Sequence, residues 1–495
     1  MADSRNGFRA LYVGMGEYVD RSLTDIHRIM ARETSTHQKA LQINLDSSKH
    51  GTFAEIGAGQ EVARWFFHVG GASGTVAKTI SAYDMAVSDS LYGHSNRYVS
   101  RERLESILGL EFDLLVKQLA GQRPPETAFF VFADTMATRS FSRHDDGHGW
   151  MGVRFQYQPD SAPSEIILHV RMLDTENARE QEAIGILGVN LLSGAFYLRD
   201  RPEELIASLM DELTRERIVI DLIRFSGPCF STIDNRLMIL QLVVQQFTGA
   251  VMFTAAGEVV QPAEAIYKRP VIVERGSFRP VTNLTIDMIE RAQECFRDAN
   301  AREAPQPVVI LEMTLKNLLE GDTPDHADFL ARADVLGALG HTVMITSYGP
   351  HHQLARYLRR YTQAPILFAL GVPGLRELFD PRYYTELPGG ILEGFGQLFC
   401  GDLKLSVYPS RDTASGKVLT MDDVDVDSTV RHLYQHLVEN GMILPIQNVD
   451  EDQLHIFPQD VLNKIRGCDS SWESMVPAAA VEMIKKRGLF GYRSN

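Results

Sequence analysis

Helical and strand-like patterns of apolar residues alternate along almost the whole chain of 495 residues. Apolar residues that recur every three or four positions indicate helices, and short runs rich in β-branched residues indicate strands. Alternation of the two is typical of α/β proteins. We therefore predict an α/β fold, with a mixed α/β N-terminal half, a Rossmann-like parallel-sheet C-terminal domain and a helical C-terminal segment.

The same pattern, interrupted by prolines, divides the chain into four expected regions. Pro124 and Pro125 break the pattern between the first two, and a polar stretch that contains Pro305 suits a linker before the third. In chain order we expect a mainly helical N-terminal region, a mixed α/β domain, a parallel α/β domain and a mainly helical C-terminal region, over residues 1–121, 122–304, 305–410 and 411–495.

The N-terminal region has mainly helical periodicity. Predicted helices cover residues 22–33, 60–69, 74–88 and 100–120. Ser100 is a plausible N-cap for the last of them. Only residues 40–45 have an extended pattern, and the glycine-rich segment 53–60 precedes a helix without a convincing hydrophobic strand.

Strand-like runs become frequent from residue 127 onward. In the middle region they cover residues 127–134, 150–157, 164–173, 217–225, 250–255 and 270–276. Helical runs between them cover residues 177–197, 202–213 and 231–247. After residue 305, apolar strands at 307–313, 342–348, 365–371 and 403–409 alternate with helical runs. Strands that are apolar on both faces and separated by helices predict a parallel sheet with right-handed crossovers.

Composition narrows the expected partners and compartment. Forty-nine basic and 64 acidic residues give a formal charge of −15, which disfavours non-specific binding to nucleic acid or anionic lipid. The four widely spaced cysteines form no CxxC pair and indicate a reducing compartment. Met1 is followed by polar residues, not an export signal. The longest apolar run has 16 residues, whereas a bilayer span needs about 20. We expect a cytoplasmic protein with a small-molecule ligand and no nucleic-acid or membrane partner.

The first candidate site is a glycine-led segment before an expected helix. Backbone N–H groups and the helix dipole would attract a phosphate there, with charge and a hydroxyl from side chains. The residues expected at the ligand are Gly70, Gly71, Ser73, Gly74, Lys78 and Thr79. The spacing differs from a Walker loop because Ala77, not glycine, precedes Lys78. Alternatively, the glycines only permit close helix packing or left-handed caps.

The second candidate site is the loop "RHDDGHGW" between two expected strands. His144, Asp146 and His148 have the side chains to bind a divalent metal. Asp145, Asp146 and His148 could instead act as a general acid and base. Arg154, just beyond, could hold a planar anionic ligand. The alternative is a solvated turn in which Asp and Gly serve backbone geometry.

The third candidate site follows from the expected topology. In an open parallel sheet, ligands bind beyond the carboxyl ends of the strands. Glu312 is placed there as a candidate base, with Arg376 to hold a carboxylate or phosphate and with Ser347 and Tyr348 as further ligand contacts. The alternative is that these residues only shape turns and helix starts.

Residues 53–85, 275–288 and 489–492 resemble a family of soluble bacterial proteins of about this length. That family is sometimes labelled nicotinate-nucleotide adenylyltransferase or TonB-dependent receptor. The first label implies a strand followed by G-x-F-x-P-x-H-x-G-H at the start of a helix, and this sequence lacks that motif. The second implies an export signal and many amphipathic strands of about ten residues, which are also missing. The resemblance therefore transfers no catalytic residue.

Two functions remain open on the sequence. One is a cytosolic enzyme that binds a small anionic or nucleotide-like ligand, with a nucleotide or a divalent metal as its expected cofactor. The other is a non-catalytic, homo-oligomeric scaffold or regulatory protein, favoured by abundant apolar helices and by the lack of a sharp catalytic motif. The sequence does not decide whether the protein is an enzyme, and a homo-oligomer is expected in either case.

Overall fold

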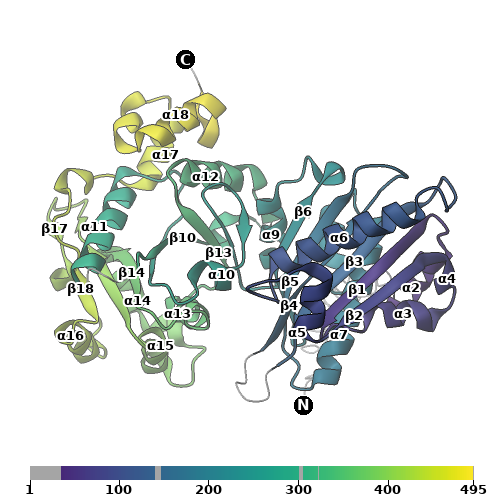
Figure 1. The fold of residues 1–495 in the computed structure, drawn as a ribbon. Coiled ribbons are helices and arrows are strands. Elements are labelled where there is room, and N and C mark those ends of the chain that lie inside the picture. The colour runs from purple at the N-terminus through teal and green to yellow at the C-terminus, as the bar shows by residue number, and fades with distance from the viewer. Residues whose placement is uncertain (1–34, 140–145, 300–304, 322, 494–495) are drawn as a thin grey trace, which may run out of the picture. The chain divides into compact units, whose positions relative to one another are not determined.

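The structure is a computed structural model that describes residues 35–139, 146–299, 305–321 and 323–493. The chain divides into two compact units (Figure 1). Unit 1 comprises the described residues of Met1–Val219 together with Phe225–Ser231, and unit 2 comprises those of Ile220–Arg224 and Thr232–Asn495. Each unit is built around its own sheet with helices, so the predicted α/β class is confirmed.

Unit 1 contains a six-stranded sheet in the order β2-β1-β3-β4-β5-β6. Its strands are β1 (Lys49–Gly57), β2 (Val76–Ala82), β3 (Ala128–Ala137), β4 (Gly147–Phe155), β5 (Ser164–Met172) and β6 (Ile218–Ser226). β1 is parallel to both β2 and β3, whereas β4 is antiparallel to both of its neighbours, β3 and β5. The sheet is therefore mixed, and β2 is an edge strand.

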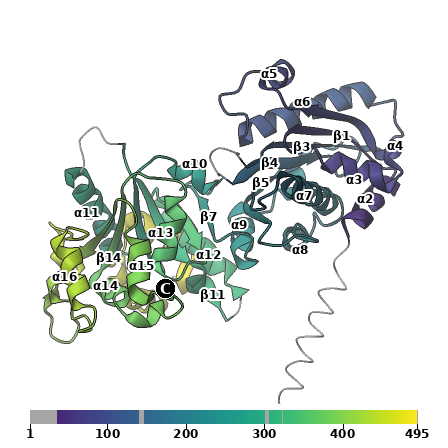
Figure 2. The same ribbon diagram turned by 90° about the horizontal axis from the view of Figure 1, so that it is seen from below.

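Helices cover both faces of this sheet. Figure 2 shows α6 (Arg101–Leu119) on one face and α2 (Thr36–Leu45), α3 (Val62–Val69) and α7 (Asn177–Tyr197) on the other. The remaining helices are α4 (Ala72–Thr75), α5 (Met85–Tyr92) and α8 (Pro202–Ser208). Aromatic rings fill the layer beneath α3, where the ring centroids of Phe53 and Phe66 lie 4.9 Å apart. Burial of such large apolar side chains holds the layers together.

Unit 2 contains an eight-stranded sheet in the order β18-β15-β14-β9-β10-β13-β7-β8. Its strands are β7 (Ala250–Phe253), β8 (Val259–Val260), β9 (Val271–Arg275), β10 (Val308–Thr314), β13 (Thr342–Thr346), β14 (Ile366–Gly371), β15 (Leu403–Tyr408) and β18 (Ile443–Pro445). The strands from β18 to β13 are all parallel to their neighbours. β7 and β8 extend the β13 edge in antiparallel fashion.

The strand order of unit 2 reverses at its centre. The chain passes from β9 outward to β10 and β13, and then returns to β14, on the other side of β9, before continuing to β15 and β18. This is the doubly wound order of Rossmann-like sheets, with the topological switch point between β9 and β14. The predicted Rossmann-like parallel sheet is therefore present.

Two apolar clusters cover the two faces of this sheet. One includes residues of β14 and of helices α13 (His351–Arg359), α14 (Val372–Leu378), α15 (Gly390–Leu398) and α16 (Arg431–Glu439). The other includes Met288, Ala292 and Phe296 of α11 (Asn283–Ala299). Further helices are α9 (Asn235–Val244), α10 (Pro262–Ile266), α12 (His326–Ala338), α17 (Pro458–Arg466) and α18 (Ala478–Arg487).

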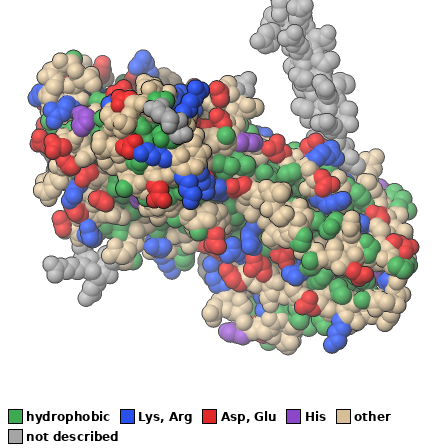
Figure 3. All heavy atoms as spheres, turned by 90° about the horizontal axis from the view of Figure 1, so that it is seen from above, with side chains coloured by type: hydrophobic (Ala, Val, Ile, Leu, Met, Phe, Trp, Pro, Cys, Tyr) green, Lys and Arg blue, Asp and Glu red, His purple; other side chains and the backbone are tan. Residues whose placement is uncertain are grey.

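Surface charge is mixed, and membrane-spanning helices are not found. Figure 3 shows Lys and Arg side chains interspersed with Asp and Glu side chains on the visible face. Among the described residues, none of the helices has both the length and the apolar character needed to cross a bilayer.

Three sequence-based element assignments in unit 1 are wrong. Residues 40–45 belong to helix α2, which Ser35 and Gln38 start with a reciprocal capping box. Residues 76–82 form the edge strand β2, not a helix, and pair with β1. Residues 49–57 form β1, which polar residues within a buried strand had concealed. In each case, capping or strand pairing outweighed local propensity.

Candidate functional site

A cavity of about 750 Å³ opens at the carboxyl ends of the parallel strands of unit 2. Its walls include the last residues of β9, β14 and β15 and the segments that follow β10 and β13. Residues at these strand ends are Arg275, Gly276, Thr314, Ser347, Gly371 and Pro409. The cavity therefore lies at the edge where doubly wound sheets bind ligands, as the third candidate site predicts.

Arg275 and Glu312 form a buried ion pair beside the cavity. Arg275 Nε lies 2.5 Å from Glu312 Oε2, and the Glu312 side chain is 0% exposed. Thr346 also donates a hydrogen bond to Glu312. Burial raises the pKa of Glu312, while Arg275 and the hydrogen bond from Thr346 oppose this rise. Such a carboxylate, paired and hydrogen-bonded, is held in place by its neighbours.

Arg275 also fixes the loop that follows β13. Its Nη2 group donates to Tyr348 O over 2.9 Å, and its Nη1 group donates to Gly349 O. The guanidinium thus joins β9, β10 and this loop in one hydrogen-bonded unit. Because its charge is balanced by Glu312, Arg275 is better suited to shape the wall than to bind an anion.

Lys316 supplies a positive charge that is not balanced by such a partner. It follows β10 in a short 3-10 helix, lines the cavity and is exposed. Within the part of the chain that the structure describes, its ammonium group has no ion-pair partner. An anionic ligand group is therefore the natural partner for Lys316.

His351 is the first residue of α13 and lines the same cavity. Burial, together with the charges of Arg275 and His352, lowers the pKa of His351 to about 3. Its imidazole is therefore neutral at physiological pH and offers one hydrogen-bond donor and one acceptor. With so low a pKa the imidazole is a weak base, so its expected role is to hydrogen-bond a ligand in the neutral form.

The rest of the wall is largely apolar and aromatic. Tyr383, Tyr384, Tyr408 and Phe457 contribute rings. Hydrogen bonds fix two of them, because Tyr384 donates to Leu378 O over 2.7 Å and Tyr408 donates to Asp287 over 2.5 Å. An apolar wall with a few placed polar groups is typical of a small-molecule site.

The third candidate set is only partly brought together. Ser347 lines the cavity, as do Gly371 and Gly374. Tyr348 packs its ring 5.3 Å from that of Tyr357 and is not among the lining residues. Arg376 is exposed on α14 and outside the cavity lining. The cation beside Glu312 is Arg275, and Arg376 lies outside the cavity lining, so its role in holding an anionic ligand stays a prediction.

The first candidate set lies in unit 1 on different elements from those expected. Gly70 and Gly71 have positive φ angles of 81° and 77°, and α4 is a single turn that includes Ser73 and Gly74. No long helix follows, because Lys78 and Thr79 lie on β2. The Lys78 ammonium is 2.6 Å from Glu111 Oε2. The glycine-led helix is therefore wrong, and the ligand role of these residues stays a prediction.

The second candidate set falls partly outside the described residues, where His144 and Asp145 lie. Asp146 forms an ion pair with Arg171 over 2.5 Å, and the His148 ring is 5.7 Å from that of His169. The described residues contain no group of three metal-ligating side chains placed to hold an ion. The metal and acid–base roles stay predictions.

Arg154, the anion-binding candidate beside that loop, is already paired. Its Nη1 group lies 2.5 Å from Glu165 Oε1, and its guanidinium lies over the Phe112 ring at 5.4 Å. The side chain thus bridges the β4–β5 pair and α6 within unit 1. Its proposed ligand contact also stays a prediction.

A pair of buried carboxyl groups in unit 1 was missed by the sequence analysis. Glu55 on β1 accepts hydrogen bonds from Val62 N at 2.7 Å and Ala63 N at 3.2 Å. Asp134 on β3 accepts one from Ile56 N at 3.1 Å. The available signal was the Gly-x-Gly turn after Glu55, since this turn follows a strand and precedes α3, as in other βα units.

Comparisons with known proteins give only remote structural similarity. No family model matches the chain, and no curated protein matches it. The competence/damage inducible protein CihA from Agrobacterium tumefaciens is 16% identical and aligns over 32% of this chain and 93% of its own, with a TM-score of 0.23.

Two further solved structures are similarly remote. The competence or damage-inducible protein from Enterobacter asburiae is 11% identical over 33% of this chain and 98% of its own, with a TM-score of 0.24. A competence-damaged protein (CinA) superfamily protein from Enterobacter cloacae is 13% identical over 35% and 92%, with a TM-score of 0.23. None of the three carries the adenylyltransferase or receptor label, and we draw no functional argument from them.

Proposed function

We propose that unit 2 binds a small anionic, nucleotide-like molecule in the cavity at the carboxyl ends of its parallel strands. The observation that carries this proposal is the cavity itself, about 750 Å³ in volume and lying along the topological switch of a doubly wound sheet. Its size falls in the range of roughly 300–1,000 Å³ that small-molecule sites occupy. A ligand of this kind is available in the cytosol, the compartment that the sequence predicts.

The wall chemistry supports a ligand with two different ends. Lys316 offers a positive charge for a phosphate or carboxylate. Tyr384, Tyr408 and Phe457 offer aromatic surface for a planar or apolar body. We expect the neutral His351 to hydrogen-bond the ligand, with Glu312 holding Arg275 in place as a positioning residue.

The test measures ligand binding to the full protein. Isothermal titration with AMP, NAD⁺, CoA and inorganic phosphate is compared between wild type and Gly374→Leu. Gly374 lines the cavity, and a Cβ there meets only Leu370 atoms at 3.6–3.7 Å, which is ordinary contact, so we expect a leucine to be tolerated and to narrow the cavity. We expect binding of at least one nucleotide by the wild type and its loss in G374L.

Gly396→Leu is the matched control, because Gly396 is an exposed glycine of α15 with open space at its Cβ position and lies outside the cavity lining. Lys316→Ala should weaken the anionic ligands, and Lys486→Ala, on α18, should not. Binding that is unchanged in both G374L and K316A would refute the proposed site. Failure of the wild type to bind any probe would refute the ligand class.

A second function, a homo-oligomeric scaffold, is favoured by the edge of unit 1. Within the described part of the chain, strand β2 has a neighbour, β1, on one side only. The segment after it exposes Tyr83, Met85, Val87 and Leu91 by 77%, 61%, 48% and 42%. Exposed edges and apolar patches are common at subunit interfaces. Sedimentation of the wild type and of Tyr83→Asp/Met85→Asp tests this: we expect an oligomer that the double substitution dissociates, and a wild-type monomer would contradict it.

A further inference from the structure

Glu274 is a buried acidic residue in the central strand of unit 2. It lies on β9 with 4% exposure, and its register partners are Leu311 on β10 and Ala369 on β14. Its Oε2 atom has no hydrogen-bond partner among the residues that the structure describes. A buried polar atom without a partner destabilises the fold, so a carboxyl group here calls for an explanation.

The side chain of Glu274 belongs to the face of the sheet that α11 covers. Ile272, two residues earlier on the same strand, packs in the α11 cluster with Met288, and alternate residues of a strand point to the same face. Ala369, Met288 and Tyr408 of this cluster also line the 750 Å³ cavity. Glu274 is not itself among the residues that line the cavity, but it lies beside Ala369 on the α11 side of the sheet, next to the cavity wall.

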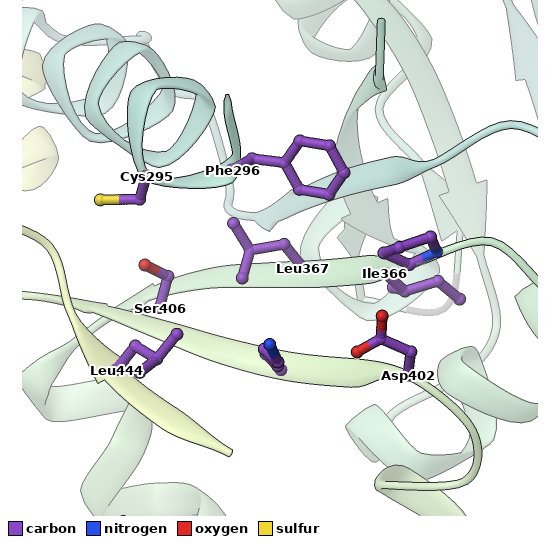
Figure 4. A pocket seen from close by; sticks show the side chains of 9 residues that line it. Cys295, Phe296, Ile366, Leu367, Asp402, Ser406 and Leu444 are labelled. Carbon is purple, nitrogen blue, oxygen red and sulfur yellow. The ribbon is translucent and has the colours of Figure 1, made fainter. Parts of the chain in front are cut away.

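A second polar group without a partner lies in the same row of the sheet. Ser406 on β15 is the register partner of Ala369, is 1% exposed, and its Oγ atom has no hydrogen-bond partner. Figure 4 shows Ser406 and Leu367 on the side of the strands that faces Cys295 and Phe296 of α11. Glu274 and Ser406 thus flank the small Ala369, which lines the 750 Å³ cavity, whereas Ser406 itself lines a separate small pocket with Cys295 and Phe296.

The protonation state of Glu274 defines which partner fits. Burial raises the pKa of this carboxyl group well above its ordinary value, and no charged group offsets the effect. A protonated carboxyl group presents one donor and one acceptor side by side. A ring nitrogen beside an exocyclic amino group presents the complementary acceptor and donor.

We propose that Glu274 recognises the amino-substituted heterocycle of the ligand, so that the nucleotide-like molecule carries an aminopurine or aminopyrimidine base. The base lies against α11 and Ala369, and its amino group and adjacent ring nitrogen pair with the Glu274 carboxyl group. The anionic end then extends toward Lys316, which lines the same cavity. This inference rests on the proposed function and adds the chemical class of the base.

The experiment measures binding of two probes to the full protein at pH 7. AMP carries the amino group, and purine riboside 5′-monophosphate lacks it but is otherwise the same. We compare wild type, Glu274→Gln and Glu274→Leu by isothermal titration. Glutamine keeps one acceptor and adds amide donors, whereas leucine removes both functions.

We expect the wild type and E274Q to bind AMP with affinities within about threefold of each other, and E274L to bind it about 10- to 100-fold more weakly, as loss of buried hydrogen bonds implies. The wild type should also bind AMP about 10- to 100-fold more tightly than purine riboside 5′-monophosphate, which lacks the amino group. Thermal unfolding confirms that both variants are folded, and removal of the unpaired carboxyl group should not destabilise either.

Two results would overturn the inference. One is AMP binding that E274L leaves unchanged, and the other is equal affinity of the wild type for the two probes. If G374L weakens binding of NAD⁺, CoA or phosphate while E274L leaves the affinity for AMP unchanged, the proposed function stands and the proposed role of Glu274 is refuted. If no probe binds the wild type, both fail together.

Discussion

Glu55 on β1 and Asp134 on β3 are register partners on neighbouring parallel strands, and both side chains are buried. Burial raises the pKa of Glu55 from 4.5 to about 7, and burial together with the Glu55 charge raises that of Asp134. The folded protein therefore binds more protons than the unfolded chain between pH 4.5 and about 7. The contribution of this pair to the free energy of unfolding is therefore most favourable near pH 4.5 and becomes less favourable as the pH rises to about 7.

We predict that Asp134→Asn removes the part of this pH dependence that comes from the Asp134 carboxyl group, whereas the pKa of Glu55 stays raised because its burial remains. The asparagine oxygen can still accept the hydrogen bond from Ile56 N, while its amide no longer repels Glu55. Relative to the wild type, D134N should gain stability as the pH rises from 5 to 8, because asparagine has no buried carboxyl group that must ionise. Urea unfolding at each pH measures this, with the exposed Asp113→Asn as control. A constant difference across the range would contradict the prediction.

The second prediction concerns the Arg275–Glu312 ion pair of unit 2. Arg275→Met leaves the carboxylate of Glu312, which is 0% exposed, without its cation. Breaking a buried pair on one side costs about 3–5 kcal/mol. The double variant Arg275→Met/Glu312→Leu should recover much of this loss, because no buried charge remains. A double-mutant cycle by urea unfolding measures the coupling, and additive effects of the two substitutions would count against it.

The third prediction concerns the glycine turn after β1. A Cβ on Gly59 would lie 2.4 Å from Asp134 Oδ2, which is too close without movement of the buried carboxyl group. Gly59→Ala should therefore destabilise the protein by about 1–3 kcal/mol. Gly396→Ala, with open space at its Cβ, should have little effect or stabilise α15. Equal melting temperatures for G59A and the wild type would show that the turn accommodates a side chain.

The sequence was most informative where strands are apolar on both faces. The strands that contain Glu312 and Ser347 were predicted, and the parallel arrangement then placed their ends at one edge. Strand β1 was missed because Lys49, His50, Thr52 and Glu55 occupy a strand that is nevertheless mostly buried. The strands that pair with β1 come from distant segments, β2 and β3, so the local sequence pattern does not reveal this pairing.

At the candidate site, too, the sequence predicted the position of the strand ends but not the side-chain contacts. Topology placed Glu312 and Ser347 at the sheet edge where the cavity opens, but it did not identify Arg275 as the partner of Glu312. Glu274 lies in an apolar strand, so its sequence context gave no sign that the carboxyl group is buried without a partner. The pairing of Arg275 with Glu312 and the burial of Glu274 both depend on contacts between residues far apart in the chain, which a local sequence pattern does not reveal.

The last prediction separates a structural from a ligand-binding role for Lys78. The Lys78 ammonium is 2.6 Å from Glu111, whose side chain is 3% exposed and also accepts a hydrogen bond from Tyr92. Lys78→Ala would leave this buried carboxylate without its cation, so we expect a loss of about 1–3 kcal/mol in stability. Lys78→Met/Glu111→Gln should restore much of it, because the uncompensated charge is gone.

Urea unfolding of the single and double variants measures this coupling, and Lys117→Ala on α6 provides a control outside the pair. Ligand binding gives the second readout. If Lys78 serves only Glu111, K78A should bind nucleotides with wild-type affinity under conditions in which it is folded. A folded K78A variant of unchanged stability that loses an anionic ligand would instead restore the phosphate-binding role that the glycine-led segment first suggested.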